Sequence, residues 1–284
     1  MATAGRLYDL IMSGVLRMKS VQKFIIDEVD EMLNLGFRPQ LTSIMETLPP
    51  KRQTLMFSAT LSAEIEELIQ SFFNKPEIIT IVPHGTPLEK ITQIGYPVAN
   101  FNTKLNLLAH LLKNNEEMAK ILVFASTKKL ADQIFNHIDK LFPGEVTVIH
   151  SNKSQNQRFN AINSFHEGTF RVLIATDVVA RGVDFQDISH VINFDTPAEP
   201  GDYIHRIGRT GRADKPGTSI TFISENEGVY LDQIEGFMKK LIDLKDFPEE
   251  VTVSKILTLD ERVTPLYDKP YLKEKTIKVK ISEG

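Results

Sequence analysis

The stretch ILVFASTKKLADQIFNHIDKLFPGEVTVIH, residues 121–150, contains two apolar runs separated by an amphipathic segment. The runs ILVFAST and VTVIH are short and rich in β-branched residues, which is typical of buried strands. Between them, apolar residues recur at helical spacing, at Leu130, Ile134, Ile138 and Leu141. The stretch therefore predicts a strand, a helix and a second strand, the unit from which parallel sheets are built.

The same alternation extends over most of the chain. Further apolar runs predict strands at 21–27, 53–60, 77–82, 172–177, 190–195 and 218–224. Before the run at 172, Phe159, Ile162 and Phe165 recur at helical spacing, and Gly168 is a plausible helix stop. Strands that are almost continuously apolar are typical of parallel sheets covered on both faces. The sequence therefore predicts an α/β fold.

The distribution of these runs predicts two unequal domains. Residues 82–90 contain two prolines and a glycine without a helical or strand pattern, which indicates a linker. Residues 91–225 hold a complete α/β unit, whereas residues 1–81 hold only three strand candidates, too few for a doubly wound domain. Residues 226–284 begin with a helix-like stretch and continue as a charged, weakly patterned tail, which we expect either to be partly disordered or to lie along the surface.

Composition narrows the classes of function. The 284 residues carry a formal net charge of −4, so any nucleic-acid contact must come from local arginine clusters. There are no cysteines, which excludes a disulfide scaffold and a thiolate metal site. The N-terminal residues lack the pattern of a signal peptide, and no apolar run approaches the roughly 18 residues of a membrane span. We expect a soluble, cytoplasmic protein that does not bind or span a membrane.

A cluster of carboxylates in IIDEVDEML, residues 25–33, directly follows an apolar strand. Asp27 is predicted at the strand edge where open α/β sheets bind ligands, and a carboxylate there can hold Mg²⁺ through water. Glu28 could orient or deprotonate a water. Alternatively, the carboxylates only begin a helix over residues 30–37, where negative charge meets the positive end of the dipole.

An arginine cluster in YIHRIGRTGRA, residues 203–213, is the most informative stretch. Arg206, Arg209 and Arg212 are three residues apart, with glycines between them. Guanidinium groups gathered in one place need anions opposite, and glycines let the backbone approach a ligand. The pattern favours a polyanion such as a triphosphate. A solvated basic loop is the alternative.

Three weaker features follow other strands. In TDVVARGVDF (176–185), Thr176 could contact a phosphate and Asp184 a ribose, unless Asp177 is simply an N-cap. The SAT turn at 58–60 could hydrogen-bond neighbouring carboxylates or merely cap a strand end. Gln155 and Arg158 are spaced to share one helix face and could face a shared partner, although for that pair alone a solvated helix face is the better explanation.

Taken in order, these stretches resemble the motifs of the DEAD-box RNA helicases. The matching stretches are TAGRL (3–7), DEVD (27–30), SAT (58–60), VFAST (123–127), HSNKSQNQR (150–158), ATDVVARGVD (175–184) and HRIGRTGR (205–212). The resemblance implies two RecA-like domains, with ATP in the cleft between them and single-stranded RNA across both. Residues 1–81 would be the C-terminal half of the first domain and residues 91–225 the complete second domain.

The resemblance also implies a role for each matching residue. Asp27 would coordinate Mg²⁺ through water, Glu28 would activate the hydrolytic water, and Asp30 would couple the ATP site to the second domain. The residues implied to link hydrolysis to strand separation are Ser58 and Thr60. Those implied to contact ATP are Arg209 and Arg212, at the γ-phosphate, and Asp184, at the ribose. Those implied to hold RNA phosphates are Thr3, Gly5, Arg6, Thr127 and Thr176. Those implied to serve the domain interface or RNA are Gln155, Arg158, His205 and Arg206.

One expected motif of the family is missing. The pattern G-x-x-x-x-G-K-[ST] does not occur, and Gly-Lys occurs nowhere in the chain. The sequence also has Ala4 where the family usually has proline, and Val29 where its name has alanine. We therefore expect an N-terminally truncated helicase that exposes apolar surface in residues 1–81 and has little or no ATPase activity alone. The alternatives are a nonenzymatic RNA-binding or regulatory fragment and a DNA helicase of the same superfamily.

Overall fold

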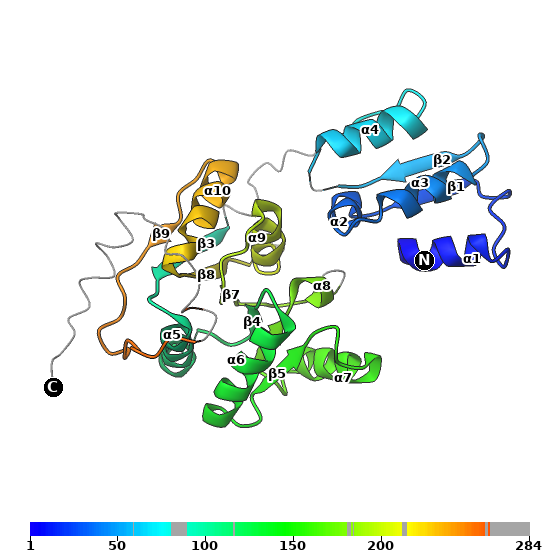
Figure 1. Cartoon of the computed structure of the whole chain (residues 1–284). Helices are drawn as coiled ribbons and strands as arrows, with labels where there is room; N and C mark the ends of the chain where they lie inside the picture. The colour runs from blue at the N-terminus through cyan, green and yellow to red at the C-terminus, as the bar shows by residue number, and fades with distance from the viewer. Residues whose placement is uncertain are drawn as a thin grey trace. The chain divides into compact units, whose positions relative to one another are not determined.

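The computed structural model describes residues 1–58, 60–80, 90–115, 117–180, 183, 185–211, 215–258 and 261. The chain divides into two compact units, Met1–Ile81 and Val82–Gly284, each described here by itself (Figure 1). Apart from its last residue, the linker predicted over 82–90 lies outside the described residues. None of the helices within the described ranges has the length and apolarity needed to cross a bilayer.

The first unit is small and has four helices and two strands among its described residues. They are α1 (Ala4–Met12), β1 (Lys23–Ile26), α2 (Val29–Asn34), α3 (Arg38–Glu46), β2 (Gln53–Met56) and α4 (Ala63–Phe72). The two strands pair in parallel, with Ile25 opposite Leu55. The core lies on one side of this pair, where Ile26, Val29 and Ile65 are buried. The strands predicted at 21–27 and 53–60 are therefore confirmed.

The other side of this two-stranded sheet is uncovered. Ile25, Leu55 and Phe57 are 60%, 39% and 53% exposed. Sheets normally need three or more strands, or a layer on each apolar face, for independent stability. The expectation of exposed apolar surface in residues 1–81 is thus confirmed.

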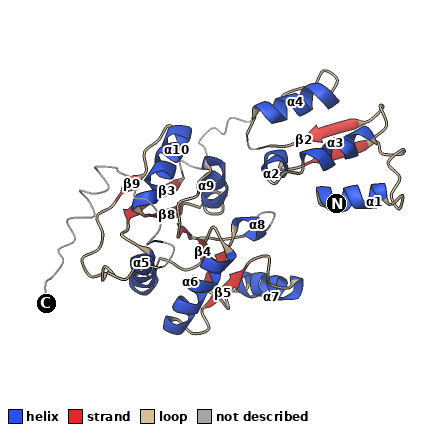
Figure 2. Ribbon diagram, in the orientation of Figure 1, coloured by secondary structure: helices blue, strands red, loops and turns tan. Residues whose placement is uncertain are grey.

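The second unit holds most of the regular structure (Figure 2). Its strands are β3 (Ile91–Pro97), β4 (Ile121–Phe124), β5 (Val146–Ile149), β6 (Val172–Ala175), β7 (His190–Asn193), β8 (Gly217–Ile223) and β9 (Asp243–Leu244). Its helices are α5 (Phe101–Asn114), α6 (Lys128–Leu141), α7 (Gln155–His166), α8 (Asp177–Ala180), α9 (Pro200–Ile207), the 3-10 turn η1 (Glu225–Glu227) and α10 (Gly228–Met238). The described strands form one seven-stranded sheet in the order β5-β6-β4-β7-β8-β3-β9, with parallel pairing throughout.

Helices cover both faces of this sheet because successive strand residues point to opposite sides. In β4, Ile121 and Val123 pack in the cluster that includes α5 and α6. Leu122 and Phe124 pack in the cluster that includes α7 and α8. The predicted α/β fold is therefore correct, and the carboxyl ends of all the parallel strands meet at one edge of the sheet.

Three strand assignments from the sequence differ from the structure, and one of them is the two-residue strand β9, which was not expected. Residues 77–80 have no regular structure, although the run at 77–82 predicted a strand. Conversely, β3 was not expected, because Gly95 and Pro97 interrupt its apolar pattern. A Cβ at Gly95 would lie 2.5 Å from Leu244 Cδ2 and 2.9 Å from Ile223 Cδ1, so the ends of these two side chains would have to move.

The two helices predicted by spacing are present with small corrections. In α6, Ile134 and Ile138 are fully buried, but Leu141 is 53% exposed at the end of the helix. In α7, Phe165 is buried, whereas Phe159 is 62% exposed and faces solvent rather than the core. Gly168 follows α7 with a φ of +82°, as expected of a helix stop.

The segment after α10 is fixed along α5 as far as residue 258. Asparagine side chains of α5 and its N-cap donate to alternate backbone oxygens of this segment. The pairs are Asn106 to Thr252 at 2.8 Å, Asn100 to Ser254 at 2.6 Å and Asn102 to Ile256 at 2.8 Å. This agrees with the expectation of a surface-lying segment, while residues 262–284 lie outside the described residues.

Candidate functional site

The first group of candidate residues follows β1 in the smaller unit. Asp27 and Glu28 are both exposed, and Asp27 Oδ1 accepts a hydrogen bond from the Glu28 backbone N–H at 3.0 Å. Glu28 is the N-cap of α2 and has a φ of 51°, in the left-handed region that non-glycine residues rarely adopt. The turn therefore presents two carboxylates to solvent at the end of a parallel strand. Oxygen ligands of this kind suit a hydrated Mg²⁺.

Two of the predicted residues, Asp30 after β1 and Thr60 after β2, are hydrogen-bonded to each other. Thr60 donates to Asp30 Oδ2 from its backbone N–H at 3.1 Å and from its hydroxyl at 3.2 Å. The Thr60 N–H also lies 3.4 Å from Ser58 Oγ. Asp30 is only 7% exposed, so these bonds fix the turn after β2 to the start of α2. The prediction that Ser58 and Thr60 hydrogen-bond a neighbouring carboxylate is confirmed for Thr60. Ala59, between them, lies outside the described residues.

The N-terminal residues form the first turn of α1. Thr3 is the N-cap, and its side chain makes no capping hydrogen bond. Thr3 and Arg6 are exposed, and Gly5 is half-buried. Backbone N–H groups in the first turn of a helix lack intrahelical partners, and together with Arg6 they are suited to an anion.

In the larger unit, candidate residues follow three neighbouring strands at one edge. Thr127 follows β4, is exposed, and accepts a hydrogen bond from the Leu130 N–H at 3.1 Å as the N-cap of α6. Thr176 follows β6 and is 6% exposed. Gln155 and Arg158 lie in the first turn of α7, after β5, and Arg158 donates to the Gln155 side chain. The sheet order thus places these residues along one edge.

A buried histidine orients the turn between β5 and α7. His150 Nε2 lies 3.0 Å from Asp132 Oδ1, and Lys153 Nζ lies 3.1 Å from the same oxygen. Burial alone would raise the pKa of Asp132, but its hydrogen bonds to His150 and Lys153 outweigh burial and lower the pKa. Asp132 was not singled out from the sequence, because an acidic residue on a helix face is usually solvated.

The arginine cluster differs from its expected arrangement. Arg206 is 2% exposed, and its guanidinium forms a two-pronged ion pair with Asp177 at 2.6 Å and 2.8 Å. Arg206 therefore contacts the interior of its own unit, and the expectation that it meets a ligand, RNA or the other domain needs correction. Its spacing from Arg209 suggested a shared ligand. Side chains along a helix point in different directions, however, and that of Arg206 points toward the sheet.

The remaining members of that cluster have separate environments. Arg209 is half-buried and donates from Nη1 to the Val183 backbone oxygen at 3.0 Å. His205 is half-buried on α9. Arg212 and Asp184 lie outside the described residues. Burial alone would lower the pKa of Arg206, but the hydrogen bond to Asp177 and the charges of Asp177, Asp195 and Asp202 outweigh it and raise the pKa, so Arg206 stays charged.

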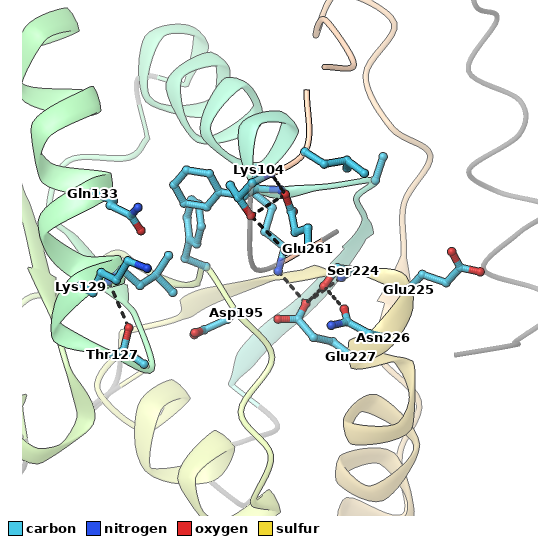
Figure 3. Close-up of a pocket in the computed structure, with 16 residues that line it drawn as sticks. Lys104, Thr127, Lys129, Gln133, Asp195, Ser224, Glu225, Asn226, Glu227 and Glu261 are labelled. Carbon is cyan, nitrogen blue, oxygen red and sulfur yellow. Dashed lines mark hydrogen bonds and ion pairs between the residues drawn. The ribbon is translucent and has the colours of Figure 1, made fainter. Parts of the chain in front are cut away.

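A cavity of about 360 Å³ lies beside Thr127, between α5, α6 and the segment near Thr258. Figure 3 shows Lys104 directed toward Glu227, and their atoms Nζ and Oε2 are 2.6 Å apart in a nearly buried ion pair. The lining carboxylates are Asp195, Glu225, Glu227 and Glu261, against the ammonium groups of Lys104 and Lys129. Because acidic groups outnumber basic ones, the cavity does not favour a phosphate. Lys104 and Glu227 are 123 residues apart and belong to no motif, so no sequence pattern indicates that they pair.

Family models match both units of the chain. The model described as DEAD/DEAH box helicase matches residues 1–68, and the helicase conserved C-terminal domain matches residues 103–214. The structure of the Escherichia coli DEAD-box protein SrmB, bound to regulator of ribonuclease activity A, has a TM-score of 0.54 and 32% identity. That match covers 59% of this chain and 98% of the SrmB chain. The chain belongs to the DEAD-box helicase family.

Other DEAD-box relatives match a larger part of the chain. The ATP-dependent RNA helicase DBP2 of Candida albicans is 41% identical over 226 residues, which are 79% of this chain and 40% of that protein. The structure of Saccharomyces cerevisiae Dbp5 bound to RNA and ADP BeF3 has a TM-score of 0.75 at 29% identity, covering 87% of this chain and 64% of that one. This DEAD-box chain spans between 40% and 54% of the length of the curated relatives compared.

Proposed function

We propose that this chain supplies the RNA-binding and part of the ATP-hydrolysing machinery of an ATP-dependent RNA helicase. The observation that carries the proposal is the row of Thr127, Thr176, Gln155 and Arg158 at adjacent strand ends of one parallel sheet. Backbone-phosphate contact needs few positive charges per nucleotide, so a chain with a net charge of −4 can still hold RNA. Membership of the DEAD-box family supports RNA and ATP with Mg²⁺ as the ligands.

The carboxylates of the smaller unit suit the metal-dependent part of ATP hydrolysis. Asp27 would hold Mg²⁺ through water, and Glu28 would take a proton from the attacking water. Mg²⁺ would neutralise charge that develops on the phosphates. Asp30, held by Thr60, would keep the turn after β2 in register with this site. The exposure of Asp27 and Glu28 supports these roles, because neither carboxylate is enclosed by the unit itself.

The larger unit would stabilise the negative charge of the γ-phosphate. Arg209 and Arg212 are the proposed arginine fingers, and Asp184 is the proposed ribose contact. In the smaller unit, Thr3, Gly5 and Arg6 would hold RNA phosphates at the start of α1. His205 is proposed to serve the interface between the units. A nonenzymatic RNA-binding fragment is the second candidate, and the absence of any Gly-Lys pair in the sequence favours it for this chain acting alone.

Replacing Arg158 by alanine should weaken RNA binding equally for all sequences. For single-stranded nucleic acid, a plot of log K against the logarithm of the salt concentration falls with a slope of about −0.7 for each phosphate that the protein neutralises. Arg158→Ala should therefore reduce the measured salt slope by roughly 0.7 to 1. Fluorescence anisotropy with labelled ten-nucleotide oligouridylate and oligoadenylate, from 50 to 300 mM KCl, measures this slope.

The matched control is Lys140→Ala, which also removes one positive charge, here an exposed one in the last turn of α6, away from Thr127 at the start of that helix. This variant should keep the wild-type slope. Deoxy oligonucleotides in the same titration test the choice of RNA, since the 2′-hydroxyl distinguishes the two polymers. Equal slopes for Arg158→Ala and Lys140→Ala, or absence of wild-type binding, would count against the proposal.

A further inference from the structure

Arg206 connects the ends of three strands, although it lies on none of them. It holds Asp177, two residues beyond β6, through both carboxylate oxygens. Its Nη1 donates to the backbone oxygen of Asp195, two residues beyond β7, at 3.0 Å. Its guanidinium stands over the ring of Phe124, the last residue of β4, at 5.3 Å from the centroid. A single buried side chain of α9 thus holds the carboxyl ends of β4, β6 and β7 together.

Two of the proposed RNA-contacting threonines lie next to groups that Arg206 holds. Thr176 immediately precedes Asp177. Thr127 immediately follows Ser126, whose backbone N–H donates to Asp195 Oδ2 at 2.9 Å. A displacement of Thr176 would therefore move Asp177, and a displacement of Thr127 would move Asp195, and both of these residues are bonded to Arg206.

The proposed arginine finger Arg209 lies two residues beyond the end of α9. The Arg209 backbone N–H donates to the Arg206 oxygen at 3.1 Å, and Arg209 Nη1 donates to the Val183 oxygen. Arg206 and Arg209 are thus joined to each other and hold Asp177 and Val183. A small pocket of about 10 Å³ borders Phe124, Asp177, Arg206 and Arg209.

We propose that Arg206 is a positioning residue that couples RNA contact at the strand ends to the placement of Arg209. The inference rests on the proposed function, because it assumes that RNA binds near Thr127 and Thr176. Arginine is required because its planar fork meets both oxygens of Asp177 while a third nitrogen reaches Asp195. Lysine at the same position would keep the charge but could not make these bonds together.

The test follows backbone amide signals of the full chain by two-dimensional NMR during titration with ten-nucleotide oligouridylate. In the wild type, amides beside Thr127 should shift, and so should those of Arg209 and Thr210. In Arg206→Lys, the amides beside Thr127 should still shift, but the shifts of Arg209 and Thr210 should fall to less than half. RNA affinity should change by less than about threefold, because Arg206 itself does not reach solvent. The control Lys215→Ala, at an exposed ion pair with Asp187, should behave as wild type.

Each result decides between the possibilities. Equal shifts of Arg209 and Thr210 in wild type and Arg206→Lys would overturn the coupling. So would wild-type shifts confined to the strand ends, a result that needs no variant and stands even if Arg206→Lys fails to fold. Absence of any wild-type RNA binding would overturn the proposed function and this inference with it. That failure is visible in the first titration, before the variants are compared.

Discussion

Phosphate release from this chain incubated with ATP and Mg²⁺ is expected to stay at background, with or without single-stranded RNA. The backbone N–H groups and the lysine of a phosphate-binding loop supply most of the affinity for the β- and γ-phosphates. No Gly-Lys pair occurs in the sequence, so Asp27 and Glu28 have no anchored triphosphate on which to act. A malachite-green assay measures the release, and the RNA helicase DBP2 of Candida albicans serves as positive control.

Clear RNA-stimulated turnover by this chain would contradict that expectation. Glu28→Gln would then locate the activity, because loss of a general base costs about 10²- to 10⁴-fold in rate. A rate unchanged by Glu28→Gln would point to a contaminating ATPase. A rate lost in Glu28→Gln would mean that the triphosphate is held without a Gly-Lys loop.

Replacing Asp177 by alanine should destabilise the larger unit by about 3–5 kcal/mol, because removing one partner of a buried ion pair leaves the other charge uncompensated. Arg206 is 2% exposed and makes both of its shortest bonds to Asp177. Native-state hydrogen exchange at amides of β4 and β6 measures the loss for this unit alone. That choice matters because two units need not unfold in one step.

The control for this prediction is Lys215→Ala, which breaks the Lys215–Asp187 pair, whose side chains are 72% and 62% exposed. Exposed pairs contribute little because water screens both charges. Lys215→Ala should therefore leave the exchange rates of β4 and β6 nearly unchanged. A loss below about 1 kcal/mol in Asp177→Ala would show that Asp195 alone can compensate the guanidinium.

The sequence was most reliable where the chain repeats a simple pattern. Apolar runs at 121–127, 146–150 and 172–177 became β4, β5 and β6, because strands buried on both faces need apolar residues at every position. The pattern failed at β3, which contains Gly95, a residue that ordinarily argues against a strand and here lies against the side chain of Leu244. It also failed at residues 77–80, which have no regular structure although their run is apolar.

The candidate site was predictable only in part. Motif order identified Asp30 and Thr60, which the structure brings into contact. The same spacing argument misplaced Arg206, because regular spacing along a chain does not reveal which side chains turn inward. The Lys104–Glu227 pair and the asparagine bonds of α5 join residues more than a hundred positions apart. Such contacts arise from tertiary packing, and no local sequence pattern predicts them.

The central claim is that the carboxylates after β1 and the two arginines that follow α9, Arg209 and Arg212, serve one nucleotide while both units hold one RNA strand. Because the chain has no cysteine, cysteines placed at exposed Asn34 and Ala198 can carry a donor and an acceptor dye without background labelling. Single-molecule energy transfer is then measured with saturating single-stranded RNA and millimolar Mg²⁺–ATP. We expect a broad distribution of transfer efficiencies without ligands, and a single population with a shorter distance between the two dyes when the ligands are bound. A distribution unchanged when RNA is bound would contradict this expectation.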